Sequence, residues 1–530
     1  MKADRRALLK GGMAAVTALA LPACDDALPG SSGGADAERG HRLRDGRFPE
    51  PVREEHVPIL IVGGGVAGLA AGWRLMEAGF GDFRLIELED QIGGNARSGR
   101  NAISAYPLGA HYLPIPNEEA RGLRHMLRGF GVILGEEGGR PIYDPQQLCA
   151  DLQERLLWQG RWQEGLIPRT GLTSKDKADL AAFDNAMKAF SARRDAQGRP
   201  AFAIPTAYSA HEPDLLALDY ISFASWLDQQ GWTSPILRAH VRYACRDDYG
   251  TEPAEVSAWA GIHYFASRRG FVARGSGDNE LTWPEGNARL TTLMAQAIGS
   301  RIQTGQIAFR AAKDGNKAIV DVFDSSCGAS IRYRADAAIL SMPQFIASRL
   351  LGHKGDPNFS YAPWLVANVT MDRAPGGKGS PLAWDNVSVS SVSLGYVVAT
   401  HQNASRQGPT VLTWYLPLSD MPPATGRRLL LKRSDDAWRR MIRDDLLAMN
   451  PDLDGAIRSI DLWKWGHAMI RPTPGFLRWT GASRQPAHSP FVRAHSDMSG
   501  LSLFEEAHYH GLVGAEYALS HIHHPFETLL

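Results

Sequence analysis

One segment near the N-terminus, residues 57–87, constrains the fold more than any other part of this chain. It opens with a wholly apolar stretch, residues 57–62, which is typical of a strand buried on both faces of a parallel sheet. Three features follow in order: a glycine-rich turn, a helix-forming stretch, and a second strand that ends in an acid (63–68, 69–78 and 83–87). This order predicts a βαβ unit that binds a dinucleotide. The alternative is a glycine turn in an unrelated α/β protein.

Each glycine of this turn has its own expected task. Gly63 permits the tight turn, Gly65 lets a pyrophosphate approach the backbone, and Gly68 lets the helix pack on the strand. The helix N-terminus then faces the anion, and Glu87 can accept hydrogen bonds from the ribose hydroxyls. Such a unit suits NAD and FAD equally well. The predicted dinucleotide-binding residues here are Gly63, Gly65, Val66, Ala67, Gly68, Glu87 and Leu88.

Composition narrows the class of protein. The 57 basic and 57 acidic side chains cancel, so no positive field is available to hold nucleic acid. Hydrophobic residues make up 44% of the 530 residues, enough for a large core. The four cysteines are widely spaced, and the histidines near the C-terminus resemble a solvated tail, so neither a zinc site nor a disulfide framework is expected.

The first 24 residues have the order of an export signal. A basic head that contains Arg5 and Arg6 precedes an apolar stretch, residues 11–23, which is too short to span a bilayer comfortably. The arginine pair resembles a twin-arginine signal, which implies the export machinery of that name as a partner. Residues 21–24 resemble a lipobox ending at Cys24. A lipid anchor at Cys24 and plain cleavage after Ala23 both remain open.

This signal leads to three expectations. The protein is bacterial and exported, either periplasmic or anchored to the outside of the cytoplasmic membrane. It acquires a cofactor before export, because the twin-arginine route carries folded proteins. Residues 25–56, rich in Asp, Gly, Ser, Arg and Pro, are predicted to be a flexible linker.

Residues 88–98 favour one cofactor. Gly93 and Gly94 are followed by Asn95 and, two residues on, by Arg97. The segment resembles the superfamily of flavin-containing amine oxidases and phytoene desaturases, in which a Gly-Gly pair, usually followed by Arg, runs along the FAD phosphates. Asn95 stands at the arginine position here, and Arg97 is expected to supply the charge. The resemblance implies FAD, bound non-covalently because no cysteine follows Cys327.

Later segments resemble the same superfamily. Residues 283–290 resemble its turn and helix, and residues 301–307 and 337–343 its returning strands. The resemblance implies that Ile307 offers backbone groups to the adenine and that Asp497 contacts the ribityl chain and pyrophosphate. Glu506 and Ala507 lie at the start of a helix expected to point at the pyrimidine end of the flavin, with Glu506 replacing a family glycine.

The implied architecture is an α/β FAD-binding (Rossmann-like, GxGxxG) domain with an inserted α+β substrate domain. The expected FAD-binding segments are 57–148, 280–351 and 458–530, and the substrate segments are 149–279 and 352–457. Within the substrate segments the sequence predicts helices over 215–230, 234–246 and 427–449 and strands over 363–372 and 387–400.

The candidate catalytic residues come from two segments. His111 and Tyr112 follow an apparent hairpin where the family chain passes the flavin ring, and Trp465 and His467 lie in an aromatic segment expected beside it. A cage for a cationic or flat substrate is one interpretation. Ordinary core packing of the indoles and a backbone-bonded histidine are the alternatives. Residues 246–250 are interpreted as a capped turn. No lysine can be placed near the flavin; Arg349 falls closest to that position.

The leading hypothesis is an FAD-dependent oxidoreductase that oxidises a small-molecule amine by hydride transfer to the flavin, with oxygen or an electron carrier as acceptor. The alternative enzyme is a desaturase or isomerase acting on C–C bonds of an apolar substrate. From another class comes a non-catalytic flavin-binding partner protein.

Overall fold

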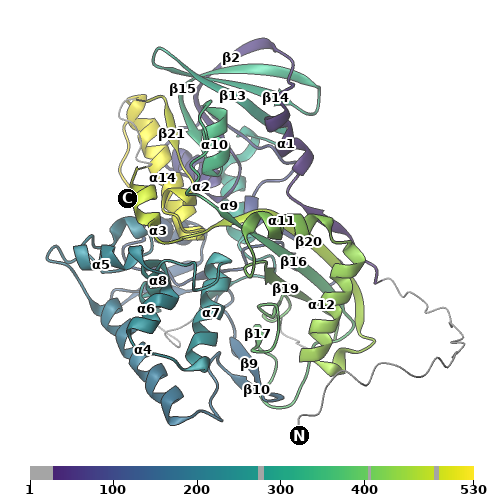
Figure 1. Cartoon of the computed structure of the whole chain (residues 1–530). Coiled ribbons are helices and arrows are strands. Elements are labelled where there is room, and N and C mark those ends of the chain that lie inside the picture. The colour runs from purple at the N-terminus through teal and green to yellow at the C-terminus, as the bar shows by residue number, and fades with distance from the viewer. Residues whose placement is uncertain (1–27, 273–279, 404–407, 483–488) are drawn as a thin grey trace, which may run out of the picture.

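The computed structural model describes residues 28–272, 280–403, 408–482 and 489–530. The predicted export signal, including Cys24, lies outside these residues. The described chain forms two large sheets, one in the upper and one in the lower half of Figure 1, with helices packed on both. This arrangement confirms the predicted fold class, a Rossmann-like α/β domain that carries an inserted α+β domain.

The dinucleotide-binding domain is built on a seven-stranded sheet. Its parallel part has the order β12, β3, β2, β15, β21, and β13 and β14 form an antiparallel meander with the first half of β15. The strands are β2 (Pro51–Val62), β3 (Phe83–Ile86), β12 (Ile302–Gln303), β13 (Gln306–Asp314), β14 (Lys317–Asp324), β15 (Ala329–Leu340) and β21 (Phe491–Arg493). The two predicted strands are thus β2 and β3, although β2 begins at Pro51 rather than at residue 57.

Strand β2 is buried on both faces, as its unbroken apolar sequence requires. Ile59 and Ile61 pack in the cluster beneath α2, whereas Leu60 and Val62 belong to the cluster on the opposite face of the sheet. Helix α2 packs between α9 and α14. The helices of this domain are α2 (Val66–Glu77), α3 (Arg121–Gly129), α9 (Ala288–Ile298), α10 (Gln344–Leu350) and α14 (Phe504–His521).

The inserted domain is built on an eight-stranded sheet in the order β1, β20, β16, β19, β18, β17, β9, β10. Its strands are β1 (Ser32–Gly34), β9 (Glu154–Trp158), β10 (Arg161–Glu164), β16 (Tyr361–Met371), β17 (Asp385–Ser388), β18 (Tyr396–Val398), β19 (Thr410–Pro417) and β20 (Ile457–Ile470). Because β20 pairs along most of its length with β16, the return to the FAD-binding domain follows residue 470, and the expected boundary at 458 is too early.

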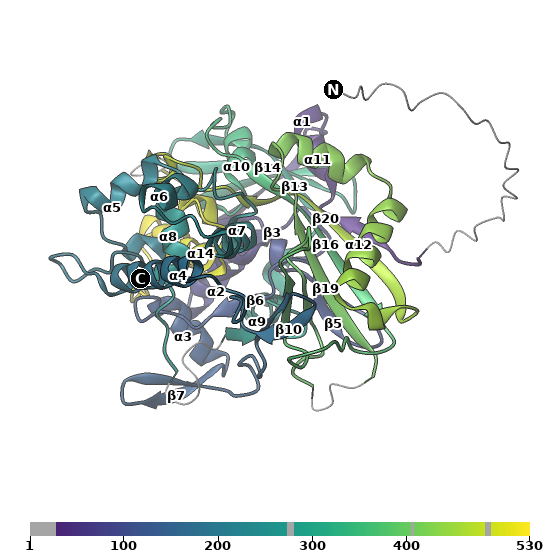
Figure 2. The same cartoon turned by 60° about the horizontal axis from the view of Figure 1, so that its bottom comes forward.

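Period-two alternation gives this sheet two different faces. Leu365 and Trp414 pack with Trp438 beneath α11 (Pro423–Lys432) and α12 (Asp435–Met449), which cover one face in Figure 2. Trp364 and Tyr415 point to the other face, into a separate aromatic cluster. The second face looks toward the dinucleotide-binding domain, so the aromatic residues on it are available to line a site between the two domains.

A helical block completes the inserted domain. It consists of α4 (Ser174–Ala192), α5 (Pro213–Ala217), α6 (Phe223–Gln229), α7 (Pro235–Tyr249), α8 (Ala258–Ala266) and α13 (Phe476–Ala482). Its core is strongly aromatic, with Phe202, Phe223 and Trp259 buried together. Short two-stranded ribbons fill the rest: β4 (Ser98–Arg100) with β5 (Ala105–Pro107), β6 (Tyr112–Pro114) with β11 (Glu280–Thr282), and β7 (Ile133–Glu137) with β8 (Arg140–Tyr143).

Two predicted helices are each divided by a serine cap. Residues 215–230 form α5 and α6, and the side chain of Ser222 accepts the Ser225 N–H at the start of α6. Residues 427–449 form α11 and α12, and Ser434 accepts the Ala437 N–H. A serine side chain that satisfies free N–H groups stabilises a new helix start within an otherwise helical pattern. The predicted strand over 387–400 is likewise two strands, β17 and β18.

The flexible-linker prediction is wrong for residues 28–56. This segment contains β1, helix α1 (Ala37–Asp45) and the first half of β2, and it pairs with both large sheets. Residues 25–27 lie outside the described part of the chain. A glycine-rich composition suggested a linker, but glycine also allows two backbone segments to pack closely, and that is its role here. A Cβ atom on Gly33 would lie 2.4 Å from the Trp463 ring, and one on Gly34 would lie 2.5 Å from the Lys464 carbonyl oxygen.

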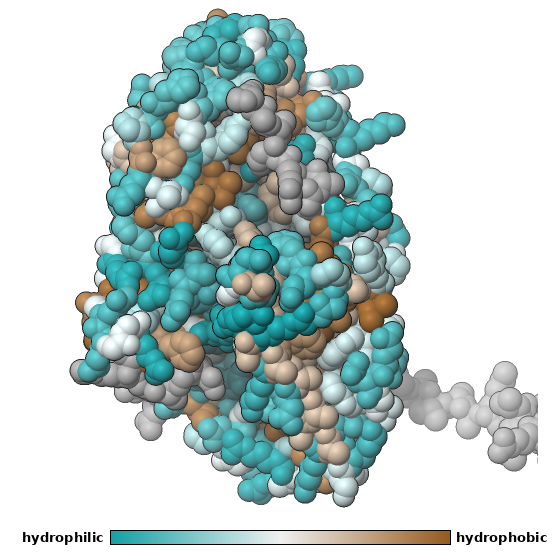
Figure 3. Space-filling view, turned by 90° about the vertical axis from the view of Figure 1, so that its left-hand side faces the viewer, coloured by the Kyte–Doolittle hydropathy of each residue, from teal (hydrophilic) through white to brown (hydrophobic). Residues whose placement is uncertain are grey.

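The surface on the left of Figure 1 is mainly hydrophilic, with separate apolar patches between polar side chains (Figure 3). Among the described residues, no helix has both the length and the apolar character needed to cross a membrane.

Candidate active site

Two adjoining cavities lie between the domains. The larger, of about 370 Å³, follows the glycine turn, the end of β3 and the start of α14, and is called the dinucleotide cavity. The smaller, of about 140 Å³, lies between the aromatic face of the inserted sheet and the helical block, and is called the reaction cavity. Both are lined by Asn95, Ala110, Trp465, Ala468 and residues 502–504. A ligand that fills the dinucleotide cavity can therefore present one end to the reaction cavity.

Most of the predicted cofactor-binding residues line the dinucleotide cavity. They are Gly63, Gly65, Val66, Ala67, Glu87, Leu88, Gly94, Asn95, Arg97, Asp497 and Ala507. Gly68 and Gly93 lie directly behind this surface. Gly93 donates its N–H to the Gly64 carbonyl oxygen at 2.8 Å, which joins the two glycine-rich loops that sequence separates.

The glycines of the first turn are required for different reasons. Gly63 has a φ of +109°, in the left-handed region that favours glycine. A Cβ atom on Gly68 would lie 1.8 Å from the Gly63 carbonyl oxygen, so the helix could not approach the strand. Gly65 has an ordinary φ of −74°, and a Cβ atom there would meet only the Gly94 Cα, 4.0 Å away. Protein packing therefore explains Gly63 and Gly68, whereas Gly65 faces open cavity.

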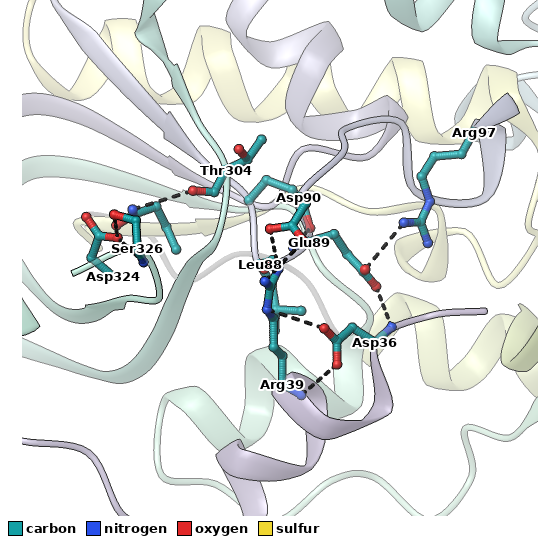
Figure 4. Close-up of polar contacts among 11 residues, drawn as sticks. Asp36, Arg39, Leu88, Glu89, Asp90, Arg97, Thr304, Asp324 and Ser326 are labelled. Atoms are coloured by element: carbon teal, nitrogen blue, oxygen red, sulfur yellow. Dashed lines mark hydrogen bonds and ion pairs between the residues drawn. The ribbon is translucent and has the colours of Figure 1, made fainter. Parts of the chain in front are cut away.

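Polar residues at the end of β3 suit the ribose and phosphates. The Glu87 carboxylate accepts the N–H groups of Gly64 and Glu89, at 2.5 and 2.9 Å, and burial raises its pKa. Arg97 is buried; its guanidinium lies 3.4 Å from the Glu89 carboxylate and about 5 Å from the ring centres of Trp463 and Trp465. Figure 4 shows Arg97 directed at Glu89. This arrangement holds a cation at the edge of the cavity, as a phosphate group requires.

Asp497 carries an unused acceptor at the other end of this cavity. Its Oδ2 accepts the Gln344 N–H and the Tyr361 hydroxyl, at 2.8 and 2.6 Å. Its buried Oδ1 accepts no hydrogen bond from the described residues. The ring of His495 lies beside it, with Nδ1 3.1 Å from Oδ1. A buried acceptor of this kind fits a ligand hydroxyl group.

Two further predicted cofactor-binding residues line neither cavity. The side chain of Ile307 is buried in the sheet, and its neighbours Gln306 and Ala308 line the dinucleotide cavity, so the contact of the Ile307 backbone with an adenine stays a prediction. The Glu506 carboxylate, which stands where the resemblance has a glycine, accepts the Thr206 N–H and the Ser499 hydroxyl. Burial raises the pKa of Glu506 to about 7. The residue after it, Ala507, is the one that faces the cavity.

These observations show that the residues present fit FAD. The open space at Gly65, the α2 N-terminus behind it, the cation of Arg97 and the free acceptor of Asp497 suit a pyrophosphate flanked by two hydroxylated groups. The start of α14 lies where the two cavities meet, and its N-terminal partial charge stabilises negative charge there.

The reaction cavity is lined by aromatic rings. His111, Tyr112 and Trp465 from the predicted set line it together with Trp364 and Tyr415. His467 lies apart from them, on the wall of the dinucleotide cavity only, 5.0 Å between ring centres from Phe345. The Trp465 indole N–H donates to the Leu108 carbonyl oxygen at 2.6 Å, which fixes the ring between the two cavities.

His111 is neutral in this setting. Its ring stacks on Tyr415, with 4.6 Å between ring centres, and burial lowers its pKa to about 4. A histidine with this pKa carries no charge near neutral pH and forms part of the aromatic wall, so proton transfer by His111 is not favoured, and positioning of the substrate is the role left to it. Tyr112 keeps its proton because burial and Asp247 raise its pKa.

Carboxylates are the feature that sequence reasoning missed. Asp247 lines the reaction cavity and also a further chamber of about 40 Å³ behind Tyr112, which we call the acidic chamber. Its acids are Glu154, Asp247, Glu280 and Asp385, and its rings include Tyr243 and Trp384. Burial and the neighbouring Asp248 raise the pKa of Asp247 to about 7. Burial and Glu154 raise the pKa of Glu280 and of Asp385 as well.

One arginine, Arg268, lines the reaction cavity, and its positive charge is balanced by a neighbouring carboxylate. Arg268 contacts both oxygens of the Asp248 carboxylate, at 3.0 and 2.8 Å. Asp247 and Glu505 are then left as the other acids on the walls of this cavity, and burial raises the pKa of Glu505 to about 7. The cavity therefore favours a cation, whose charge would lower these raised pKa values.

A local signal for Asp247 exists in the sequence. Asp247 and Asp248 occupy the last turn of α7, where the helix dipole disfavours carboxylates. Two acids in this position are locally unfavourable, which is a mark of a functional site. The interpretation of residues 246–250 as a capped turn overlooked this. No comparable signal marks Asp385, which the pairing of β17 with β9 brings to the chamber from far along the chain.

The fold and the two cavities together define a class: a two-domain dinucleotide-binding protein whose inserted domain encloses one end of the cofactor site. Residues 61–130 match the family model of an NAD(P)-binding Rossmann-like domain. No curated protein matches the sequence.

Solved structures show the same fold over nearly the whole chain. A putrescine oxidase bound to putrescine has a TM-score of 0.64 and 16% identity, covering 88% of this chain and 100% of that chain. Cyclohexylamine oxidase from Brevibacterium oxydans IH-35A has a TM-score of 0.62 and 16% identity, covering 88% and 99%. A fatty acid isomerase from P. acnes that produces CLA has a TM-score of 0.60 and 16% identity, covering 87% and 98%. At these identities the likeness establishes the shared fold.

Proposed function

We propose that the protein is an FAD-dependent oxidoreductase that oxidises an amine at a C–N bond. The observation that carries this proposal is the reaction cavity itself, in which carboxylates and aromatic rings meet beside the dinucleotide cavity. Two of the solved structures with this fold are an oxidase bound to putrescine and a cyclohexylamine oxidase, which supports the same chemistry.

The cavity binds a protonated amine through two kinds of contact. Tyr112, Trp364 and Tyr415 present ring faces, and a cation over such a face is attracted by its quadrupole. Asp247, in its anionic form, supplies the opposite charge. Its pKa of about 7 also lets it accept the proton that the ammonium group must lose before oxidation.

The chain's residues would orient the substrate and exclude water, and the chemistry that FAD would supply when bound is the acceptance of a hydride from the carbon that carries the nitrogen. Trp465 and Ala110, shared by both cavities, separate the substrate from the rest of the cofactor site. No lysine lines either cavity among the described residues, and Arg349 does not line them. The electron acceptor, oxygen or a carrier, is therefore left to experiment.

A second candidate is a desaturase or isomerase acting on C–C bonds of an apolar substrate. The fold likeness to a fatty acid isomerase favours it, as do Val366, Met469 and Phe504 on the cavity wall. It ranks below amine oxidation because a hydrocarbon offers neither a positive charge nor a hydrogen-bond donor to the acids Asp247 and Glu505 on the cavity wall.

An anaerobic titration distinguishes the two candidates. The full chain, loaded with FAD, is mixed with primary, secondary and poly-amines and, as the matched set, with unsaturated fatty acids. We expect at least one amine to bleach the visible flavin band and no fatty acid to do so. Bleaching by fatty acids alone would exchange the two candidates. Because isomerisation is redox-neutral and leaves the flavin oxidised, the fatty acids are also analysed for shifted double bonds after incubation. An FAD-loaded chain that neither set reduces and that leaves the fatty acids unchanged would favour the non-catalytic flavin-binding alternative.

We also propose that the protein is exported by the twin-arginine route. The basis is the sequence of residues 1–24 alone. In a bacterial host, the wild type is expected outside the cytoplasm and the Arg5→Lys/Arg6→Lys variant inside it, as measured by cell fractionation. Replacing Cys24 with alanine then separates the two states left open. A lipid-anchored protein moves from the membrane fraction to the soluble periplasm, and a cleaved soluble protein does not change fraction.

A further inference from the structure

The segment that the sequence marked as a linker contacts both domains and borders the dinucleotide cavity. We call residues 28–46 the N-terminal strap. It starts on the inserted sheet as β1, continues as α1 at the join of the two domains (Figure 1), and leads into β2 of the dinucleotide-binding sheet. Between these attachments Ala35, Asp36, Gly40 and Leu43 line the dinucleotide cavity.

One end of the strap is hydrogen-bonded to the inserted domain. β1 pairs in parallel with β20, and Ser31 donates its N–H and hydroxyl to Asp461, both at 2.7 Å. Arg439 donates to the carbonyl oxygens of Gly30 and Ser31, at 2.8 and 3.1 Å. The approach is close, since a Cβ atom on Gly30 would lie 2.0 Å from the Ile460 carbonyl oxygen.

The other end is hydrogen-bonded to residues 88–90, which directly follow Glu87, the acid predicted to bind the ribose. The Asp36 N–H donates to the Glu89 carboxylate at 2.8 Å. Arg39 donates to both carboxylate oxygens of Asp90, at 2.7 and 3.1 Å, and to the Leu88 carbonyl oxygen at 3.2 Å. Figure 4 shows these contacts, with α1 held against residues 88–90 and with Arg97 on the far side of Glu89.

Part of the lining of the dinucleotide cavity is apolar. Ala308 of β13, Met342, and Ile346 and Leu350 of α10 line it, as does Leu43 of the strap. Glu87 lines the same cavity and supplies an acid. A flat heterocycle joined to a ribose needs both kinds of lining, apolar side chains for the heterocycle and an acid for the ribose hydroxyls.

We propose that the N-terminal strap completes the binding site for the adenosine half of FAD, so that FAD leaves only when the strap lifts off residues 88–90. This inference rests on the proposed cofactor but not on the proposed substrate. Ala35, Asp36, Gly40 and Leu43 contact the adenosine, and Arg39 acts as a positioning residue that holds α1 in place. Because the strap also pairs with β20, FAD binding and the contact between the two domains are coupled.

The test measures FAD release rather than activity. The full-length holoprotein is mixed with an excess of an unrelated apoprotein that binds FAD tightly, or passed over a desalting column, and the loss of the bound flavin spectrum is followed with time. Arg39→Gln removes the contacts to Leu88 and Asp90 without altering a cavity residue. Arg44→Gln is the matched control, because Arg44 lies on the same helix, does not line the cavity, and among the described residues pairs with its neighbour Asp45, at 3.4 Å.

We expect Arg39→Gln to release FAD at least 10-fold faster than the wild type and Arg44→Gln to release it at the wild-type rate. Gly33→Val tests the other end, since its side chain would collide with the Trp463 ring and prevent β1 from seating. It too is expected to speed release. As a second readout, bound FAD should slow trypsin cleavage after Arg42, Arg44 and Arg47 in the wild type and do so less in Arg39→Gln.

The outcomes separate this inference from the proposed function. If the wild type binds FAD and both Arg39→Gln and Gly33→Val release it at the wild-type rate, the proposed role of the strap is wrong and the cofactor assignment is unaffected. A correctly folded wild type that binds no FAD overturns both.

Discussion

Replacing Asp247 with asparagine is expected to lower kcat/KM for the amine substrate about 30- to 150-fold. The variant keeps the shape of the side chain but loses the charge that faces the ammonium group. A buried charge-assisted contact contributes about 2–3 kcal/mol, and each 1.4 kcal/mol corresponds to about a factor of ten. Steady-state kinetics with the amine identified by anaerobic titration measures the effect. Asp184→Asn, an exposed acid paired with Lys188 on α4, is the matched control and should be neutral.

The pH dependence of kcat/KM should report the ionisation of Asp247. Because the pKa of Asp247 is raised to about 7, the residue is neutral below that pH and anionic above it. In the wild type, kcat/KM should therefore rise with pH through about 7, and Asp247→Asn should lack this rise. An unchanged profile in the variant would show that another group controls the acid limb, with Glu505 the next residue to replace.

Stability should change in the opposite direction from activity. An acid whose pKa is raised in the folded state binds its proton more tightly there than in the unfolded chain, where Asp has its usual pKa near 3.9. Folding stability is then lost as the pH rises from about 4 to about 7. Asp247→Asn avoids this loss, so it should melt at a higher temperature than the wild type at pH 8 and with little difference at pH 4. A purely structural role for Asp247 would instead make the variant less stable at both values.

Replacing Gly65 with valine is expected to abolish FAD binding while leaving the fold intact. Gly65 has a φ that any residue adopts, and no protein atom lies closer than 4.0 Å to the position of an added Cβ. The side chain would instead fill the cavity where the predicted pyrophosphate approaches the α2 N-terminus. We expect a soluble, folded and colourless protein, with FAD affinity reduced at least 100-fold in fluorescence titrations.

Gly68→Val is the matched comparison. Its Cβ would lie 1.8 Å from the Gly63 carbonyl oxygen, so α2 cannot pack on β2 and the protein should fail to accumulate in folded form. The contrast between the two variants separates a glycine needed by the ligand from one needed by the fold. A Gly65→Val protein that binds FAD as tightly as the wild type would place the pyrophosphate elsewhere and contradict the assignment of this cavity.

The dinucleotide-binding unit can be predicted from the sequence alone. The apolar residues of β2, the turn at Gly63–Gly68 and the acid Glu87 follow one another along the chain, and each has one local physical task, so their order is readable without tertiary structure. Most of the cofactor-binding residues predicted in this way line the dinucleotide cavity, as does Trp465 of the aromatic segment. Prediction from local sequence is less successful where a short-range signal has two meanings. The glycines at 30, 33 and 34 suggested a flexible linker, yet each permits a close approach to β20.

The chemical character of the reaction cavity follows from contacts that form only when the chain folds. Asp385 opens β17 and Tyr415 lies on β19, and neither is marked in its own segment, whereas Asp247 is marked only by its unfavourable place in the last turn of α7. The pairing of β17 with β9 and the packing of α7 beside the inserted sheet bring the three together, and burial then raises the pKa values of the two acids. The same long-range packing engages the Glu506 carboxylate with Thr206 and places the N-terminal strap beside the dinucleotide cavity. The order of strands, turns and helices is set by neighbours in sequence, whereas charge and solvation in a cavity depend on residues that are distant in sequence and meet only in the folded chain.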